Sequence, residues 1–360
     1  MKKIGLFMVC ILFLLTGCSA KPQIADATSV TNTPNPIVTV KVVATEVLIP
    51  VPTETLVPTA APSPTSVPEE LQKLRSIMNK YGQVDEYYLS ASYWERLEDN
   101  ISKYGKARRI VPLEFHGDNY SMFDSSYEMN PARFEVMMRY LLDNDYHFVT
   151  GPELVGFLEG WLDLPSRSII LTTDSGGASL KSFSRIIPLF QQLEKEYGVR
   201  PHMLSFIWTH GMLEEETVGC IHNQCWEAFR TARDSGYFTI GSHTQTHRHF
   251  DELTLADTVW DLTVSSDKIR DNLGLTVYGI TWPFENCSPF LEKLDEMGYE
   301  FAFGGCTRMM EKMYVYEDDN MPLCLPRMFP PNTDGYSGRP SGLTLEQMLL
   351  KAESEHKPLE

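Results

Sequence analysis

The sequence predicts an α/β protein built as a (β/α) barrel and preceded by a disordered N-terminal stalk. Short apolar runs that suit buried parallel strands alternate with amphipathic helical stretches from about residue 110 onward. Polar motifs directly follow several of these runs, at the strand ends where such barrels carry their chemistry. A Pro/Thr-rich segment without helical periodicity lies before them.

The first residues are typical of a secretory signal. Two lysines precede the apolar run 4–15, which is too short to span a bilayer comfortably. The run ends in Leu15-Thr16-Gly17-Cys18, which resembles the bacterial lipobox. We therefore expect a signal peptide over 1–17 and a lipid on Cys18, which would tether the protein to the bacterial membrane on its extracytoplasmic side. The alternative is an uncleaved signal anchor with a chance cysteine.

Residues 18–68 form the expected linker. Pro and Thr recur, and such a segment cannot bury enough apolar surface to offset the entropy lost on ordering. A flexible chain of about 50 residues has an end-to-end reach of roughly 40 Å, and more where proline stiffens it. Residues 38–43 are β-prone and could instead form a stray strand.

Charge excludes nucleic acid as the expected partner. The full chain has a formal charge of −17, and loss of the signal peptide removes two lysines and brings it to about −19. Phosphate backbones require a basic surface, so neutral or cationic partners are favoured. No stretch beyond the signal is long and apolar enough to span a membrane.

Five cysteines remain beyond the signal and the lipid site, and export permits disulfides between them. Cys220 and Cys225 sit in one loop and could pair, whereas Cys287 could meet Cys306 or Cys324. Because five is odd, at least one thiol stays free or pairs between chains. No CxxC spacing exists, so a zinc knuckle is not expected.

The periodicity of the remaining chain gives its expected elements and divisions. Helices are expected over 69–81, 131–144, 183–197, 225–235, 255–273 and 289–297. Strands are expected over 110–116, 169–173, 203–208, 238–242 and 277–281, with one more beginning at residue 301. The expected divisions are a helical segment over 69–108, the barrel over 109–345 and a C-terminal tail over 346–360.

Two histidines at the end of a predicted strand are the sharpest chemical signal. His243 and His247 are four positions apart and share one face if a helical turn begins there. Such a pair can bind Zn²⁺ through ring nitrogens, with a third ligand and a water completing the site. The alternative is a polar loop of solvated or capping histidines, since His249 follows closely.

An acidic motif ends an earlier predicted strand, 169–173. Asp174 lies in Thr172-Thr173-Asp174-Ser175-Gly176, where barrel geometry predicts a catalytic role. The alternative is a helix cap or an Asx-turn, which Asp and Ser also favour. Three further motifs follow or end predicted strands, namely Glu114-Phe115-His116, Trp282-Pro283-Phe284-Glu285 and Leu325-Pro326-Arg327.

In this order and spacing, the five motifs together resemble the polysaccharide deacetylases of the NodB-homology class, which are carbohydrate esterase family 4-like. The permuted branch that includes the poly-N-acetylglucosamine deacetylases is the most similar, over about 111–327. The resemblance implies a distorted seven- or eight-stranded barrel. It implies a catalytic base at Asp174, metal ligands at His243 and His247, and a general acid at His116. It also implies that Pro283 and Phe284, with Trp282 beside them, line the site.

The activity implied is metal-assisted hydrolysis of N-acetyl groups on cell-wall or exported polysaccharide, with Zn²⁺ or another divalent metal as cofactor. The metal would polarise the acetamide carbonyl and acidify a water, Asp174 would take the water's proton, and His116 would protonate the leaving amine. The products would be acetate and an amino sugar.

The sequence departs from the family pattern at several positions. Ser175 stands where the metal-ligating Asp is expected, and a neutral hydroxyl is a poor Zn²⁺ ligand. Thr281 stands where the motif usually has arginine, and Arg327 could replace that arginine as the partner of Asp174. Glu114 or Glu285 could supply the missing carboxylate.

Two other functions are therefore kept open. One is a catalytically impaired, deacetylase-like lipoprotein that binds glycan without hydrolysing it, and the other is hydrolysis of a different amide or ester.

Overall fold

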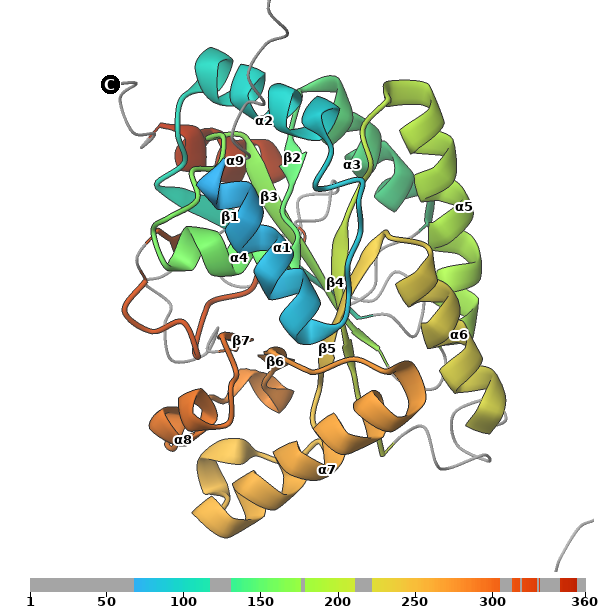
Figure 1. Cartoon of the computed structure of the whole chain (residues 1–360), viewed down its shortest axis with the longest axis vertical. Coiled ribbons are helices and arrows are strands. Elements are labelled where there is room, and N and C mark those ends of the chain that lie inside the picture. Colours follow the sequence, from blue (N-terminus) through green and yellow to red (C-terminus); the bar gives the residue numbers. More distant parts are fainter. Residues whose placement is uncertain are drawn as a thin grey trace, which may run out of the picture. The chain divides into compact units, whose positions relative to one another are not determined.

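A curled, mostly parallel sheet organises the chain (Figure 1). The computed structural model describes residues 68–116, 131–175, 179–210, 222–304, 313–317, 319–328, 330 and 344–354. The expected lipid site at Cys18 and the expected linker over 18–68, apart from its last residue, lie outside these ranges. The mixed α/β architecture confirms the predicted barrel class.

Within the described residues, eight strands form the sheet, in the order β7-β6-β5-β4-β3-β1-β8, with β2 paired to β3. The parallel strands are β1 (Arg109–His116), β2 (His147–Phe148), β3 (Ser168–Ser175), β4 (Met203–Ile207), β5 (Phe238–Ser242), β6 (Gly279–Thr281) and β7 (Phe301–Phe303). The antiparallel strand is β8 (Val315–Tyr316), which pairs with β1.

Residues 325–328 connect the two sides of the curl. Leu325 bridges in parallel to Phe303 of β7, and Met328 bridges in parallel to Leu113 of β1. The same segment therefore lies between the first and last parallel strands, and it carries Arg327 into the barrel.

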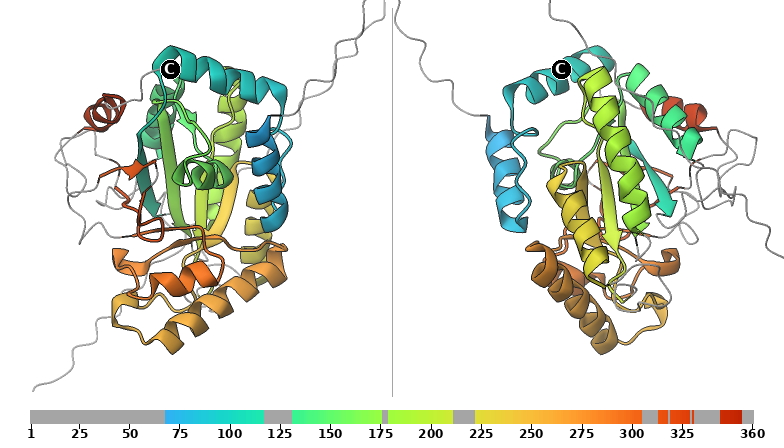
Figure 2. Two further views of the ribbon diagram at one scale, coloured as in Figure 1. Left: turned by 60° about the vertical axis from the view of Figure 1, so that its left-hand side comes forward. Right: turned by 90° about the vertical axis from the view of Figure 1, so that its right-hand side faces the viewer.

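Helices cover both faces of the sheet (Figure 2). One group packs in the larger core with the outward-facing strand residues: α3 (Pro131–Asp143), α5 (Ser179–Tyr197), α6 (His222–Asp234), α7 (Leu255–Leu273), α8 (Leu291–Glu296) and α9 (Leu345–Glu353). The second group packs with the inward-facing strand residues: α1 (Glu69–Tyr81), α2 (Ala91–Tyr104) and α4 (Gly151–Leu158). Two short 3₁₀ turns, η1 (Phe250–Glu252) and η2 (Pro283–Glu285), follow β5 and β6.

Alternation along the strands divides these two cores. In β3, Ile170 faces the inner core, whereas Ile169 and Leu171 face the outer one. Every residue of β3 is buried, as expected for a parallel strand covered on both faces. Alternate residues of a strand face the same side of the sheet. Asp174 is four residues after Ile170 and therefore also faces the inside of the barrel.

The helices and parallel strands expected from periodicity are present, with boundaries that differ by a few residues at most. The sequence analysis gave no bounds for α2, which lies in the helical segment expected over 69–108, and it missed α4, α9 and the two-residue strands β2 and β8. In α4 every residue is buried, so its sequence has no polar face to reveal helical periodicity. The predicted tail over 346–360 instead begins within α9, whose N-terminus is closed by a capping box between Thr344 and Gln347.

None of the helices in the described ranges combines the length and apolar character needed to cross a bilayer.

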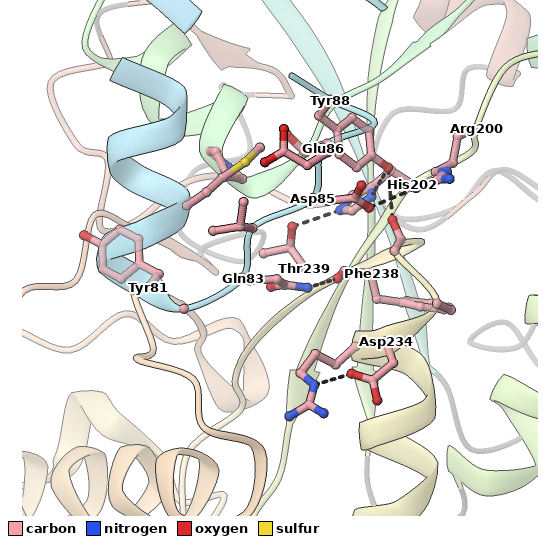
Figure 3. A pocket seen from close by; sticks show the side chains of 18 of the residues that line it. Tyr81, Gln83, Asp85, Glu86, Tyr88, Arg200, His202, Asp234, Phe238 and Thr239 are labelled. Atoms are coloured by element: carbon pink, nitrogen blue, oxygen red, sulfur yellow. Dashed lines mark hydrogen bonds and ion pairs between the residues drawn. The ribbon is translucent and has the colours of Figure 1, made fainter. Parts of the chain in front are cut away.

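A cavity of about 510 Å³ lies at the N-terminal ends of β4, β5 and β6, away from the predicted motifs (Figure 3). Its polar groups bond to one another. Arg200 Nη1 lies 2.9 Å from Asp85 Oδ2, and His202 Nδ1 lies 2.8 Å from the Tyr88 hydroxyl. His202 Nε2 lies 2.9 Å from Thr239 Oγ1. These contacts attach the segment after α1 to the barrel.

Burial of His202 predicts acid sensitivity. Desolvation lowers the pKa of His202 from 6.5 to about 3, so the unfolded chain binds this proton at a higher pH than the folded chain. Stability should therefore fall as pH decreases from about 6.5 towards 3, by up to about 1.4 kcal/mol per pH unit from this group. Urea unfolding across this range should give a shallower acid slope for His202→Gln than for the wild type. Equal slopes would contradict the prediction.

Candidate active site

Asp174, the next-to-last residue of β3, accepts several hydrogen bonds at the barrel mouth. Arg327 donates to it twice, from Nη1 to Oδ1 at 2.8 Å and from Nη2 to Oδ2 at 2.9 Å. The Thr281 hydroxyl donates to Oδ1 at 2.9 Å. Only 7% of Asp174 is exposed. A bidentate guanidinium pair favours the ionised carboxylate, which is the form that can accept a proton.

Arg327 is held between two carboxyl groups. Its Nη2 also lies 2.9 Å from Glu114 Oε1, and the Arg327 and Glu114 side chains are almost completely buried. Burial opposes the charge of Arg327, but Asp174 and Glu114 outweigh it and raise the pKa of the guanidinium. Burial, with Asp174 and Glu285 adding to it, raises the pKa of Glu114 despite the opposing effect of Arg327. The ion pair with Asp174 is therefore the dominant one.

Thr281 links Asp174 to the first histidine. Its hydroxyl lies 2.7 Å from His243 Nδ1, and its carbonyl oxygen lies 3.1 Å from the same nitrogen. Because the hydroxyl proton goes to Asp174, the Nδ1–H of His243 donates to Thr281, which leaves a lone pair on Nε2. That Nε2 atom lies 3.6 Å from Asp174 Oδ2. Thr281, which replaces the arginine expected from the family, thus orients both groups.

His247 lies beside His243 in an aromatic cluster. The two imidazole centroids are 4.8 Å apart, and Phe284 is 4.8 Å from His247 on another side. The ring of Trp208, which directly follows β4, has its centroid 5.4 Å from that of His247. Burial lowers the pKa of His243 to about 4 and lowers that of His247. Both imidazoles are therefore neutral at neutral pH.

The exposed edge of this cluster is aromatic. Phe284 is 49% exposed, and its ring stacks on His249 with centroids 4.0 Å apart. Its backbone has φ of +54°, which directs this part of η2 away from regular helical geometry. Phe284 therefore fits the predicted lining role. Trp282 does not, because it is fully buried and its Nε1 donates to the Leu323 carbonyl, so the assignment of Trp282 as a lining residue was wrong.

The donor set does not fit the three-ligand metal site that the resemblance implies. The Ser175 hydroxyl lies 3.1 Å from that of Ser205, and both oxygens of Asp174 already accept bonds from Arg327. Within the described part of the chain, no three His, Cys, Asp or Glu side chains gather where they could share an ion. Neither Glu114 nor Glu285 joins the histidines in such a group.

The structure thus brings together most of the predicted site residues, from β1, β3, β5, η2 and the 325–328 segment. His116 ends β1, and the strand register pairs its Cα with that of Asp174. The sequence analysis missed the roles of Thr281 as a hydrogen-bonding link and of Asp261, which binds the histidine loop. The available signal for Asp261 was the helical spacing of polar residues along α7, where Thr258, Asp261 and Ser265 lie on the buried face.

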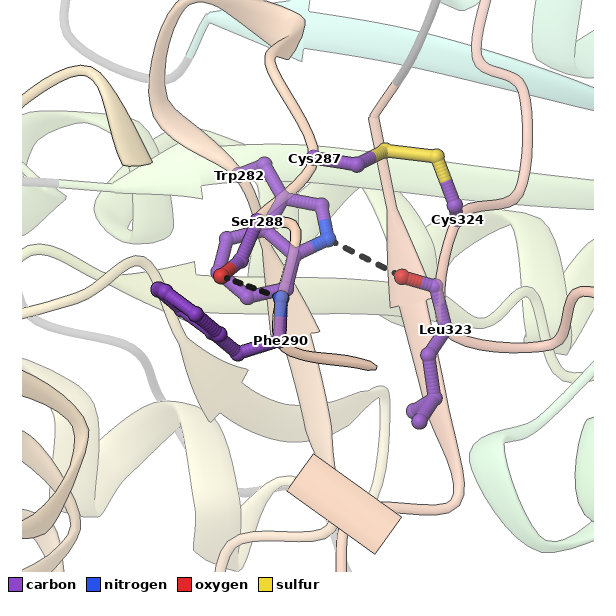
Figure 4. The surroundings of a disulfide bond; sticks show 6 residues. All are labelled: Trp282, Cys287, Ser288, Phe290, Leu323 and Cys324. Atoms are coloured by element: carbon purple, nitrogen blue, oxygen red, sulfur yellow. Dashed lines mark hydrogen bonds between the residues drawn. A yellow bond between two sulfur atoms is a disulfide. The ribbon is translucent and has the colours of Figure 1, made fainter. Parts of the chain in front are cut away.

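A disulfide joins the segment after η2 to the segment that leads to Arg327 (Figure 4). Cys287 bonds to Cys324, which resolves the alternatives left open for Cys287. Phe284 lies three residues before the first cysteine, and Arg327 lies three residues after the second. Cys225 is also disulfide-bonded, whereas Cys220 and Cys306 lie outside the described residues.

Removing this disulfide should destabilise the domain. The two cysteines are 37 residues apart, so loop-closure entropy predicts a loss of about 4 kcal/mol for the Cys287→Ser/Cys324→Ser double variant. The free energy of unfolding in urea measures it, with Cys225→Ser as a control that breaks a different disulfide. A loss below about 1 kcal/mol would show that the cross-link does not constrain the unfolded chain.

Residues 162–302 match the family model described as polysaccharide deacetylase. This part of the chain is similar to polysaccharide deacetylases. The matched region contains Asp174, His243 and His247, and it excludes both Glu114 on β1 and Arg327. The family's members are hydrolases of carbon–nitrogen bonds other than peptide bonds. Curated protein sequences gave no match to the chain.

Solved structures share the deacetylase fold. A polysaccharide deacetylase from Bacillus cereus is 19% identical, with 69% of this chain and 70% of that one covered and a TM-score of 0.50. IcaB from Ammonifex degensii is 19% identical over 69% of this chain and 98% of that one, with a TM-score of 0.52. A Streptococcus pyogenes deacetylase in complex with acetate is 15% identical over 62% and 94%, with a TM-score of 0.50.

Proposed function

We propose that the domain hydrolyses N-acetyl groups on an extracytoplasmic polysaccharide, with Asp174 as general base. The observation that carries the proposal is the pairing of a nearly buried Asp174 with Arg327 beside two neutral imidazoles at the mouth of a deacetylase barrel. The titles of the related structures name polysaccharide deacetylases and a deacetylase bound to acetate, which agrees with this substrate class.

The proposed reaction uses these residues in sequence. Asp174 accepts a proton from water as the water oxygen attacks the acetamide carbonyl. The C–N bond then breaks, and His116 protonates the leaving nitrogen, so that acetate and a free amino sugar result. Arg327 and Thr281 hold the carboxylate in place, and the neutral His243 presents Nε2 to the same space. The exposed Phe284 offers a surface on which a sugar ring can stack.

Acetate release tests this function. The domain should release acetate from chitooligosaccharides or from peptidoglycan, and each reaction should be run with and without chelator. Retention of the glycan with no acetate under any added metal would refute hydrolysis. It would support the second candidate, a glycan-binding lipoprotein, which the serine at position 175 and the incomplete donor set favour.

We expect the domain to bind zinc weakly. Among the described residues the two imidazoles have no third anionic ligand, so zinc content after dialysis against metal-free buffer should fall well below one per chain. Glu114→Ala and Glu285→Ala should leave zinc content unchanged, because Glu114 is engaged by Arg327. Elemental analysis measures this. A full equivalent of zinc that either variant removes would show that a glutamate supplies the missing ligand.

We further propose that the domain is exported and held to the membrane by lipid on Cys18. The lipobox-like sequence supports the proposal, and a linker reach of roughly 40 Å would limit the substrate to polymers near that membrane. Metabolic labelling with a fatty acid should mark the wild type, and Cys18→Ser should lose the label and leave the membrane fraction. Equal labelling of both would refute it.

A further inference from the structure

Helix α7 presents a row of polar residues to the loop that carries both site histidines. Asp261, Ser265 and Lys268 are spaced by four and three positions, so they share one face of the helix. Asp261 and Ser265 are completely buried. Leu262 and Ile269, beside them, pack in the outer core. A buried carboxylate in such a setting is costly unless it accepts several hydrogen bonds.

Asp261 accepts those bonds from the backbone between the two histidines. The Gln245 N–H donates to Oδ1 at 2.6 Å, and the Thr246 N–H donates to Oδ2 at 3.0 Å. The Thr246 hydroxyl donates to Oδ2 as well. Residues 245 and 246 are two of the three that separate His243 from His247. The loop therefore wraps around a single carboxylate.

This wrapping coincides with an unfavourable backbone conformation. Thr244 has φ of +67° and His247 has φ of +53°, in the left-handed region that β-branched residues in particular avoid. Residues persist there only where surrounding contacts determine the conformation. The bonds to Asp261 lie between these two positions and can offset that cost. The turn brings the imidazole centroids to 4.8 Å.

Other residues of the same row attach the loop at two more points. Lys268 Nζ donates to Gln245 Oε1 at 2.9 Å, and the Thr209 hydroxyl donates to the same oxygen at 2.7 Å. The Ser265 and Ser242 hydroxyls are 2.6 Å apart, and Ser242 in turn accepts from the Thr244 N–H at 3.0 Å. The amide groups of the loop are thus bound by side chains rather than by regular secondary structure.

We propose that Asp261 is a positioning residue that sets the geometry of the His243–His247 pair by binding the backbone between them. Asp261 does not touch the reacting groups and acts through the loop. Only an effect of Asp261 on acetate release would rest on the proposed function. Its effect on the imidazoles holds whether or not the domain hydrolyses glycan.

Imidazole spectra of the histidine-labelled domain test the proposal. Long-range ¹H–¹⁵N correlation reports the tautomer and surroundings of each ring. Asp261→Ala should shift or broaden the His247 signals and speed deuterium exchange of the Gln245 and Thr246 amides by at least about tenfold. Asp261→Asn keeps one acceptor and should fall between Ala and wild type. Wild-type imidazole spectra in Asp261→Ala would overturn the proposal.

Two further variants guard against misfolding as the explanation. Thr246→Val removes one bond to Asp261 without emptying a buried site, and it should shift the His247 signals in the same direction as Asp261→Ala. Asp267→Ala, on the same helix but exposed, should leave them unchanged. A folded Thr246→Val domain with wild-type His247 signals would count against the proposal. Absence of acetate from the wild type would refute the proposed function but leave this readout valid.

Discussion

Replacing Asp174 with Asn should lower acetate release by about 10³-fold, because the variant loses the only proposed proton acceptor for the attacking water. The change is nearly isosteric, and an Asn oxygen can still accept from Thr281. The amide cannot form the bidentate pair with Arg327, since its nitrogen is a donor. The rate constant for acetate release from a chitooligosaccharide, measured at saturating substrate, checks the prediction.

The matched control is Asp267→Asn, which changes an exposed aspartate on α7 and should retain wild-type activity. Thermal unfolding of both variants shows whether a loss of acetate release arises only because the domain has unfolded. If a folded Asp174→Asn domain kept more than about a tenth of the wild-type rate, Asp174 would not be the general base.

Arg327→Met should cost about 3–5 kcal/mol of stability, because it leaves the ionised Asp174 buried without its partner. The side chain of Met fills similar space, so the lost charge, and not a cavity, dominates. Urea unfolding at neutral pH measures the change. Arg270→Met, which breaks exposed pairs with Asp267 and Asp271, should cost less than about 1 kcal/mol.

A double variant separates the charge effect from packing. Asp174→Asn combined with Arg327→Met removes both charges, so it should recover part of the stability that Arg327→Met alone loses. Additive losses would show that the two side chains contribute independently, and the buried ion pair would then not be the reason for the cost.

The sequence predicted the parallel strands other than the two-residue β2, because each of them is a largely apolar run of characteristic length bounded by turn residues. It also predicted that Asp174, His243 and His247 lie near one another, because their motifs stand at the carboxyl ends of parallel strands, which lie at one edge. The fully buried α4 was missed, since a helix covered on all sides has no polar face. Trp282 was misassigned because motif position does not determine on which side of a backbone a side chain is buried.

By itself the sequence determined the barrel class, the strand-end motifs and the substitution at Ser175, since these depend on local pattern and residue identity. Only the tertiary structure decided which groups bind Asp174. Arg327 is 153 residues away in sequence and Thr281 is 107 away. Closure of the curl by residues 325–328, and the disulfide beside it, bring them together. Contacts of such separation depend on how the strands curl and on which edges meet, and no local periodicity encodes that.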